Sequence, residues 1–133
     1  MGMTVDCSNF EKAFAKITKR VSSKETKKGV FKAANELLRD AIYEIPKAPF
    51  DEGTLRGSTR AEVETKRGEV SAVAGFNIEY AARWHELTPE EDSKISWTLP
   101  GSGRKYLESK MIKFRKKYLL IIVRHIENVL RGR

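Results

Sequence analysis

The sequence predicts an α+β domain in which a small antiparallel sheet of about three to four strands packs against N-terminal helices and a long C-terminal helix. Apolar residues recur at helical spacing near the start of the chain and again over its last segment. The middle of the chain instead alternates between apolar and polar residues around a glycine-containing turn. The 133 residues suffice for one hydrophobic core, so a single domain spanning 1–133 is expected.

The first predicted helix runs from Ser8 to Val21. Phe10, Phe14 and Ile17 recur at spacings of four and three residues, which places them on one helical face. Ser8 is a favourable N-cap, because its hydroxyl can accept a hydrogen bond from a free backbone N–H of the first turn. We expect this helix to pack by its apolar face.

A second helix should run from Ser22 to about Ile45. Ser22 and Glu25 have the spacing of a capping box. Gly29 weakens the first turns by about 1 kcal/mol relative to alanine, and Pro46 ends the helix because it has no N–H to donate. The apolar line of this helix comprises Val30, Ala34, Leu37 or Leu38, Ala41 and Ile45.

A loop and a hairpin follow. Residues 46–58 contain two prolines and two glycines, which is typical of a structured loop. Residues 60–65 and 70–76 alternate between apolar and polar side chains, as strands with one buried face do. Arg67-Gly68 lies between them, so the two segments should form an antiparallel hairpin.

The segment after the hairpin predicts a short helix and a third strand. Asn77 can cap a helix over residues 78–87. Residues 88–93 are acidic and contain a proline, and we expect them to be an exposed loop. Apolar and polar residues alternate over 95–99, which predicts a strand, and residues 100–103 form a flexible turn.

The final predicted helix runs from about Lys105 to Leu130. Its apolar block at 119–123 is too wide for one helix face, so this part of the helix should be covered on more than one side. Two covers remain open: the chain's own sheet and N-terminal helices, or a neighbouring subunit. The core stripe comprises Leu107, Met111, Phe114, Tyr118, Ile121 or Ile122, and Val129. A separate basic stripe comprises Lys113, Lys117, Arg124 and Arg131.

The net charge of +8 is concentrated at the C-terminus. Residues 104–133 hold ten Lys or Arg and two acids, which leaves sixteen of each sign in the rest of the chain from totals of 26 and 18. This asymmetry suggests a negatively charged partner for the last helix, either nucleic acid or an acidic protein surface. A solvated helix face without a partner is the alternative.

An ordered series of short motifs lies between residues 45 and 86. It comprises Ile45-Pro46, Pro49, Asp51-x-Gly53-Thr54-Leu55-Arg56-x-Ser58, Gly75-Phe76-Asn77 and Tyr80-Ala81-x-x-x-His85-Glu86. With the order of the expected elements over about residues 30 to 130, this pattern resembles the small tail-completion or head–tail connector proteins of long-tailed double-stranded DNA bacteriophages, also described as neck or minor capsid proteins. The chain departs from that pattern at Glu52, where threonine is usual, and at Leu87-Thr88, where a glycine often follows the glutamate.

The resemblance implies a virion structural protein. Subunits of that family form a ring, commonly six-fold, which joins head connector and tail at the head–tail junction and lets DNA pass through its lumen. The chain would then be found in the virion, and during assembly in the host bacterial cytoplasm, where we expect it to stay monomeric until it meets a template. Contacts with other subunits or neck, connector or tail-tube proteins are expected at Asp51, Leu55, Arg56, Glu86 and Trp97. The basic stripe of Lys113, Lys117, Arg124 and Arg131 would face DNA or an acidic partner.

Enzymatic activity, a cofactor and a metal site are not expected. His85 stands beside Glu86, but the other histidine, His125, is forty residues away, and neither has the H-E-x-x-H spacing of a zinc site. No serine lies in a G-x-S-x-G context, and no apolar run approaches the ~20 residues of a membrane span. A second functional hypothesis stays open, namely a basic, non-specific nucleic-acid-binding module whose contacts depend strongly on salt.

Overall fold

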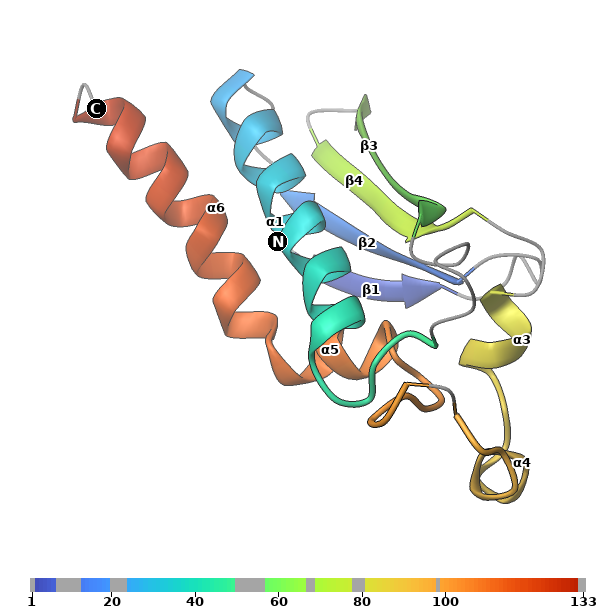
Figure 1. The fold of residues 1–133 in the computed structure, drawn as a ribbon. Coiled ribbons are helices and arrows are strands. Elements are labelled where there is room, and N and C mark those ends of the chain that lie inside the picture. The colour runs from blue at the N-terminus through green and yellow to red at the C-terminus, as the bar shows by residue number, and fades with distance from the viewer. Residues whose placement is uncertain are drawn as a thin grey trace.

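A computed structural model of the chain describes residues 2–6, 13–19, 24–49, 57–66, 69–77, 81–97 and 99–131, the first two ranges by their backbone alone. One antiparallel sheet packs against helices (Figure 1), which confirms the α+β class. The strands are β1 (Gly2–Asp6), β2 (Ala13–Lys19), β3 (Thr59–Lys66) and β4 (Glu69–Phe76), and the helices are α1 (Lys24–Tyr43), α3 (Ala81–His85), α4 (Pro89–Ser93), α5 (Glu108–Lys113) and α6 (Arg115–Leu130). None of the helices in these residues is long and apolar enough to cross a membrane.

The sheet has the strand order β1-β2-β4-β3, and each neighbouring pair is antiparallel. The β3–β4 hairpin is the one that the sequence predicts, with register running from Thr59 opposite Phe76 to Lys66 opposite Glu69. The alternating pattern predicted for β4 is confirmed, because the apolar residues of the series face the core. The fully buried members are Val70, Ala72, Ala74 and Phe76.

The N-terminal segment is extended, so the predicted helix from Ser8 to Val21 is wrong. Residues 13–19 form β2, and the remaining residues of that prediction lie outside the described part of the chain. β2 is an inner strand, paired with β1 on one side and along its whole length with β4 on the other. Two ladders of backbone hydrogen bonds outweigh a helical spacing of a few apolar residues, and a local sequence pattern cannot reveal those ladders.

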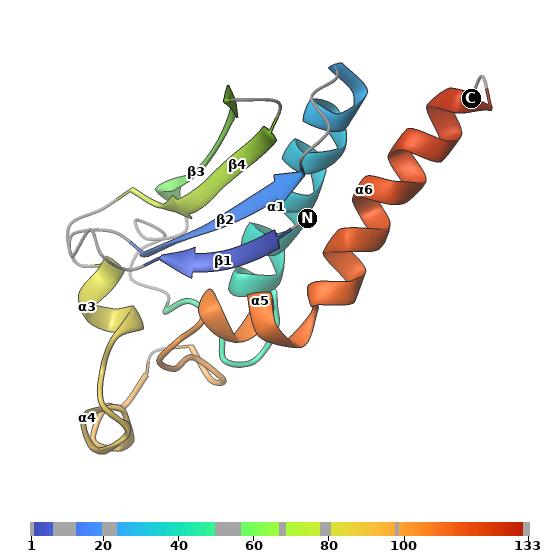
Figure 2. The ribbon, with the colours of Figure 1, turned by 180° about the vertical axis from the view of Figure 1, so that it is seen from behind.

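Helix α1 covers one face of the sheet and confirms the second predicted helix, although its Ser22 cap lies outside the described residues. Helix α6 packs against α1 on the side away from the sheet, so α1 is buried from two directions (Figure 2). Gly29 stands at this second contact, where a Cβ would lie 3.4 Å from the Cα and the carbonyl oxygen of Ile122. The glycine that disfavours the helix locally therefore permits close packing of α1 against α6.

The predicted C-terminal helix is divided into two helices. Residues 104–107 form turns, α5 begins at Glu108, and Phe114, with φ −107° and ψ 22°, separates α5 from α6. Helix α5 lies near β1 and α1, whereas α6 runs antiparallel beside α1. The predicted core stripe holds across the break: Leu107, Met111, Tyr118 and Ile122 are buried.

The predicted third strand at 95–99 is also wrong, since residues 95–97 and 99 form no strand and Thr98 is outside the described residues. Just before it, the expected loop contains the short helix α4, which begins with a complete capping box between Thr88 and Glu91. Trp97 packs edge-on against Trp84 of α3, with ring centroids 5.5 Å apart. The alternation of apolar residues therefore reflects side-chain packing on α3 and not a strand ladder.

Candidate functional site

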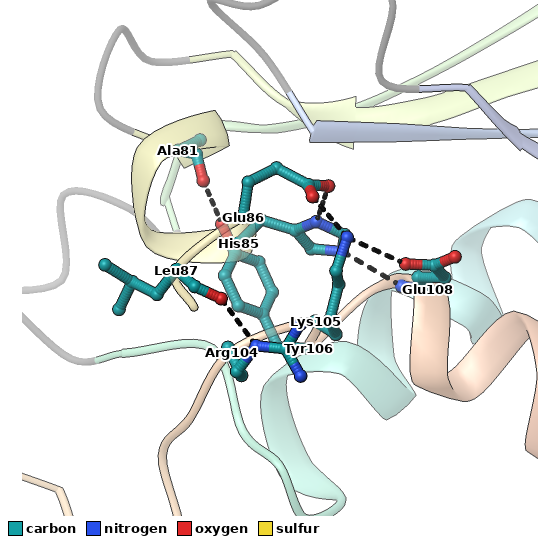
Figure 3. Close-up of polar contacts among 8 residues, drawn as sticks. All are labelled: Ala81, His85, Glu86, Leu87, Arg104, Lys105, Tyr106 and Glu108. Carbon is teal, nitrogen blue, oxygen red and sulfur yellow. Dashed lines mark hydrogen bonds and ion pairs between the residues drawn. The ribbon is translucent and has the colours of Figure 1, made fainter. Parts of the chain in front are cut away.

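A buried histidine connects α3 to the start of α5 (Figure 3). His85 is fully buried, and its Nε2 accepts a hydrogen bond from the backbone N–H of Glu108 over 3.1 Å. Since Nε2 is an acceptor, the ring proton lies on Nδ1, which donates to Glu86 Oε1 over 2.8 Å. Burial lowers the pKa of His85 and outweighs the opposite effect of the Glu86 carboxylate, so the ring is neutral.

The imidazole of His85 caps α5 from a distance in sequence. Leu107 precedes this helix and provides no side-chain hydrogen bond to its first turn. The N–H groups of a first helical turn need acceptors from outside the helix, and His85 Nε2 provides one for Glu108. The sequence gives no local signal for this contact, because its partners are separated by 23 residues.

Lys105 joins the two carboxylates beside His85. Its ammonium is hydrogen-bonded to Glu86 Oε2 and lies 3.2 Å from Glu108 Oε2. Its backbone N–H donates to the carbonyl of His85 over 2.8 Å. Lys105 has a φ of 55°, a left-handed conformation that costs roughly 1–3 kcal/mol in a residue other than glycine. The contacts to α3 and α5 offset this strain.

The same cluster has the residue types and the spacing of a metal site. One ligand atom each of His85, Glu86 and Glu108 lie within 4.8 Å of one another. However, both imidazole nitrogens are engaged, and the ammonium of Lys105 already bridges the two carboxylates. A metal ion would have to displace that ammonium, so we assign the cluster a structural role.

Two more hydrogen bonds fasten the same segments to each other. The Tyr106 hydroxyl donates to the carbonyl of Ala81 over 2.8 Å, and Arg104 Nε donates to the carbonyl of Leu87 over 2.5 Å (Figure 3). The segment that contains the Tyr80-Ala81-x-x-x-His85-Glu86 motif is therefore held by residues 104–108. In the described residues, Glu86 makes contacts within its own chain, and the predicted contact with another subunit stays a prediction.

Lys110 anchors the loop after α1. Its side chain is fully buried, and Nζ donates to the carbonyl oxygens of Pro46 and Tyr106 over 2.5 and 2.9 Å, and to Ser109 Oγ over 3.2 Å. Burial lowers its pKa to about 8. Next to this contact, Lys47 donates its N–H to the carbonyl of Gly101 over 2.8 Å. The loops after α1 and before α5 are thus tied together.

An acidic side chain is buried between α1 and α6. Asp40 accepts hydrogen bonds from the Tyr118 hydroxyl over 2.7 Å and from Lys117 Nζ over 2.8 and 3.0 Å. Lys117 Nζ also lies 3.2 Å from Glu36 Oε1. Burial disfavours the charge on Lys117, but these acids outweigh it and raise its pKa. Lys117, which we assigned to a partner-facing stripe, is therefore bound within the chain.

The side of α6 that faces away from α1 carries exposed apolar residues. Tyr118 and Ile122 are buried against the rest of the chain, while Leu120 and Val123 remain 47% and 36% exposed. Ile112 in α5 is 72% exposed. We considered two covers for residues 119–123, namely the chain's own elements and a neighbouring subunit. The described elements of the chain cover α6 on one side only. We refer to Leu120 and Val123 of α6 as the open apolar face.

The other predicted site residues have different positions. Asp51, Leu55 and Arg56 lie outside the described residues. Trp97 is half-buried on Trp84, within the chain. The remaining members of the basic stripe are exposed: Lys113, Arg124 and Arg131.

Sequence reasoning missed two buried polar residues, Asp40 and Lys110. A signal existed for both, because each is a charged residue at the spacing of an apolar helical stripe: Asp40 is three residues after Leu37, and Lys110 is three residues after Leu107. A charge at such a position indicates a buried polar contact.

A comparison with known protein families and with curated proteins finds no match to this chain.

Proposed function

We propose that this chain is a structural virion protein, a subunit of a ring at the head–tail junction of a double-stranded DNA bacteriophage. It would act in tail completion or head–tail joining, with DNA passing through the ring. The proposal rests on the ordered motifs between residues 45 and 86 and on the open apolar face of α6. Six-fold symmetry and a monomeric state before assembly belong to the same proposal.

The open apolar face supports an assembly role because large apolar side chains gain free energy when another surface covers them. Burying about 100 Å² of apolar surface is worth roughly 2.5 kcal/mol. Leu120 and Val123 lie one turn apart on α6 and are flanked by the exposed cations Lys116 and Arg124. An apolar centre with a charged rim is the usual anatomy of a protein interface.

The cluster around His85 supports this role in a different way. A subunit that must fit its neighbours needs loops with fixed shape, and the contacts from residues 104–108 to α3 fix the loop that carries α4. Helix α4 has no buried residue and extends from the body of the fold (Figure 1). We propose that this projection reaches a neighbouring protein of the junction.

The proposal is tested by in vitro complementation of particles assembled without this chain. Wild-type protein should restore infectious particles, whereas the variant Leu120→Glu/Val123→Glu should stay folded but fail to restore them. The matched control Thr65→Glu/Ser96→Glu adds the same charge at exposed positions on β3 and in the loop after α4, and it should restore them. Circular dichroism and thermal unfolding establish that both variants are folded. Full restoration by Leu120→Glu/Val123→Glu would remove the support that this face gives.

A further inference from the structure

Two charged triads join α1 to α6 along one side of the helix pair. Near the start of α1, Glu25 Oε2 lies 3.0 Å from His125 Nε2, and Glu25 Oε1 lies 3.6 Å from Lys28 Nζ. About three helical turns later, Glu36 Oε1 lies 3.3 Å from Arg39 Nη1 and 3.2 Å from Lys117 Nζ. Each glutamate thus has a cation of α1 on one side and a basic residue of α6 on the other.

These contacts identify which cations share that side of the molecule. On α1, Lys32 is four residues after Lys28 and seven before Arg39, which places all three on one helical stripe. On α6, Arg124 and Arg131 follow Lys117 at intervals of seven residues, again on one stripe. The two stripes flank the two triads, and we call them together the basic seam. Its members are Lys28, Lys32, Arg39, Lys117, Arg124 and Arg131.

The basic seam has an excess of positive charge. Its six cations stand against four acids: Glu25, Glu36 and Asp40, which are already bound by the chain's own basic or hydroxyl groups, and Glu127, which lies on α6 three residues after Arg124 and four before Arg131. In the part of the chain that the structure describes, no acid lies within 4.0 Å of the side-chain nitrogens of Lys32, Arg124 or Arg131. A charge count along the sequence does not reveal this surface, because the cations of α1 belong to a part of the chain whose net charge is zero.

We propose that the basic seam binds the phosphate backbone of duplex DNA without reading its sequence. The inference rests on the proposed function for the presence of DNA and on the seam for the contact. At ~1.5 Å per residue, Lys28 and Arg39 are separated by roughly 16 Å along α1. Phosphates of one DNA strand follow one another every ~3.4 Å along the helix axis, so the seam spans several of them. The evenly spaced phosphates of DNA can pair with both rows of cations, whereas an acidic protein would need a matching array of carboxylates.

The seam also predicts the strength of the salt dependence. Each phosphate neutralised adds about 0.9 to the slope of log K against log salt concentration. The three cations without a nearby acid predict a slope of about 3, and engagement of all six would raise it to about 5. Sequence preference should be absent, since lysine and arginine on an exposed helix pair contact phosphates and do not enter a groove.

Fluorescence anisotropy with a labelled duplex of mixed sequence tests the proposal between about 50 and 200 mM salt. The variant Lys32→Gln/Arg124→Gln/Arg131→Gln should bind at least about tenfold more weakly, and its salt slope should fall by about 2–3. The control Arg60→Gln/Lys66→Gln/Lys94→Gln removes the same charge from exposed positions on β3 and after α4, and it should keep the wild-type slope. Thermal unfolding establishes that both variants are folded.

Three results would overturn the inference: no binding by the wild type at the lowest salt, an equal loss in the control, or displacement of the duplex by polyglutamate as efficiently as by unlabelled DNA of equal charge. The last would assign the seam to an acidic protein. The complementation assay separates this inference from the proposed function. Suppose that the seam variant loses DNA binding, that the control variant keeps it, and that wild-type protein restores no infectious particles. The basic seam would then still be assigned to DNA, and the ring proposal would fail.

Discussion

The hydroxyl of Tyr118 donates a hydrogen bond to the buried carboxylate of Asp40 over 2.7 Å, which links the first turn of α6 to the last turns of α1. Burial and the adjacent carboxylate both raise the pKa of Tyr118, so its hydroxyl remains the donor. Lys117 completes the arrangement from the rim, where 41% of its side chain is exposed. The position of α6, and hence of the open apolar face and the basic seam, depends on this contact.

Tyr118→Phe should lower the free energy of unfolding by about 1.5–3 kcal/mol, because it removes a buried hydrogen bond to a charged acceptor. Lys117→Gln should cost less than about 1 kcal/mol, since that ion pair is partly solvated. Urea unfolding at neutral pH measures both. A larger loss for Lys117→Gln than for Tyr118→Phe would mean that the rim cation, and not the hydroxyl, holds α6 on α1.

Gly29→Ala should leave stability unchanged or raise it by up to about 1 kcal/mol. The new methyl would lie at van der Waals distance from Ile122 and from His125 Cβ, 3.4 and 3.5 Å away, while alanine favours the helix. Gly29→Leu should instead cost about 1–3 kcal/mol through overpacking. Thermal unfolding distinguishes the two, and strong destabilisation by alanine would show that the α1–α6 contact is tighter than described.

Stability should fall as the pH drops below about 6.5, the ordinary pKa of histidine. Burial lowers the pKa of His85 in the folded chain, so the unfolded chain binds more protons in this range, and the loss is at most about 1.4 kcal/mol per pH unit. Protonation would also remove the acceptor of the Glu108 N–H. His85→Gln should weaken this pH dependence in urea unfolding.

An NMR titration provides the direct control for that prediction. The ring protons of His85 should report protonation with a midpoint below 6.5. A midpoint at or above 6.5 in the folded protein would contradict the neutral, capping imidazole, whatever the stability of the variants.

Trp97→Ala should destabilise the isolated chain, because it removes the ring that packs on Trp84. An aromatic pair of this kind contributes about 0.5–1.5 kcal/mol beyond its buried area. The neighbouring change Ser96→Ala is at an exposed position and should have little effect on thermal unfolding. If Trp97→Ala leaves the isolated chain unchanged but impairs particle complementation, Trp97 is a partner contact, as the sequence suggested, and its packing on Trp84 is secondary.

The sequence predicted those elements whose local pattern agrees with their packing. In β4 the series Val70, Ala72 and Ala74 is fully buried, as its alternation predicts. In α1 the apolar stripe and Pro46 define the helix. The segment at 13–19 failed because its structure is decided by β1 and β4, which are its neighbours in the sheet and not in the local window.

Prediction of the candidate site succeeded where a local pattern was enough and failed where the contact is tertiary. The motif around His85 marked an important segment, but the contact from His85 to Glu108 and the left-handed backbone of Lys105 depend on how α3 meets α5. The charge count located a basic C-terminal helix. It could not show that Lys117 is bound by Asp40, or that Glu25 of α1 lies beside His125 of α6, because helix pairing is a tertiary property.

The most direct test of the proposed function is electron microscopy of phage particles decorated with an antibody against this chain. The proposal predicts label at one place on each particle, the junction between head and tail. Particles that carry no label, or that are labelled over the capsid shell or along the tail, would contradict it.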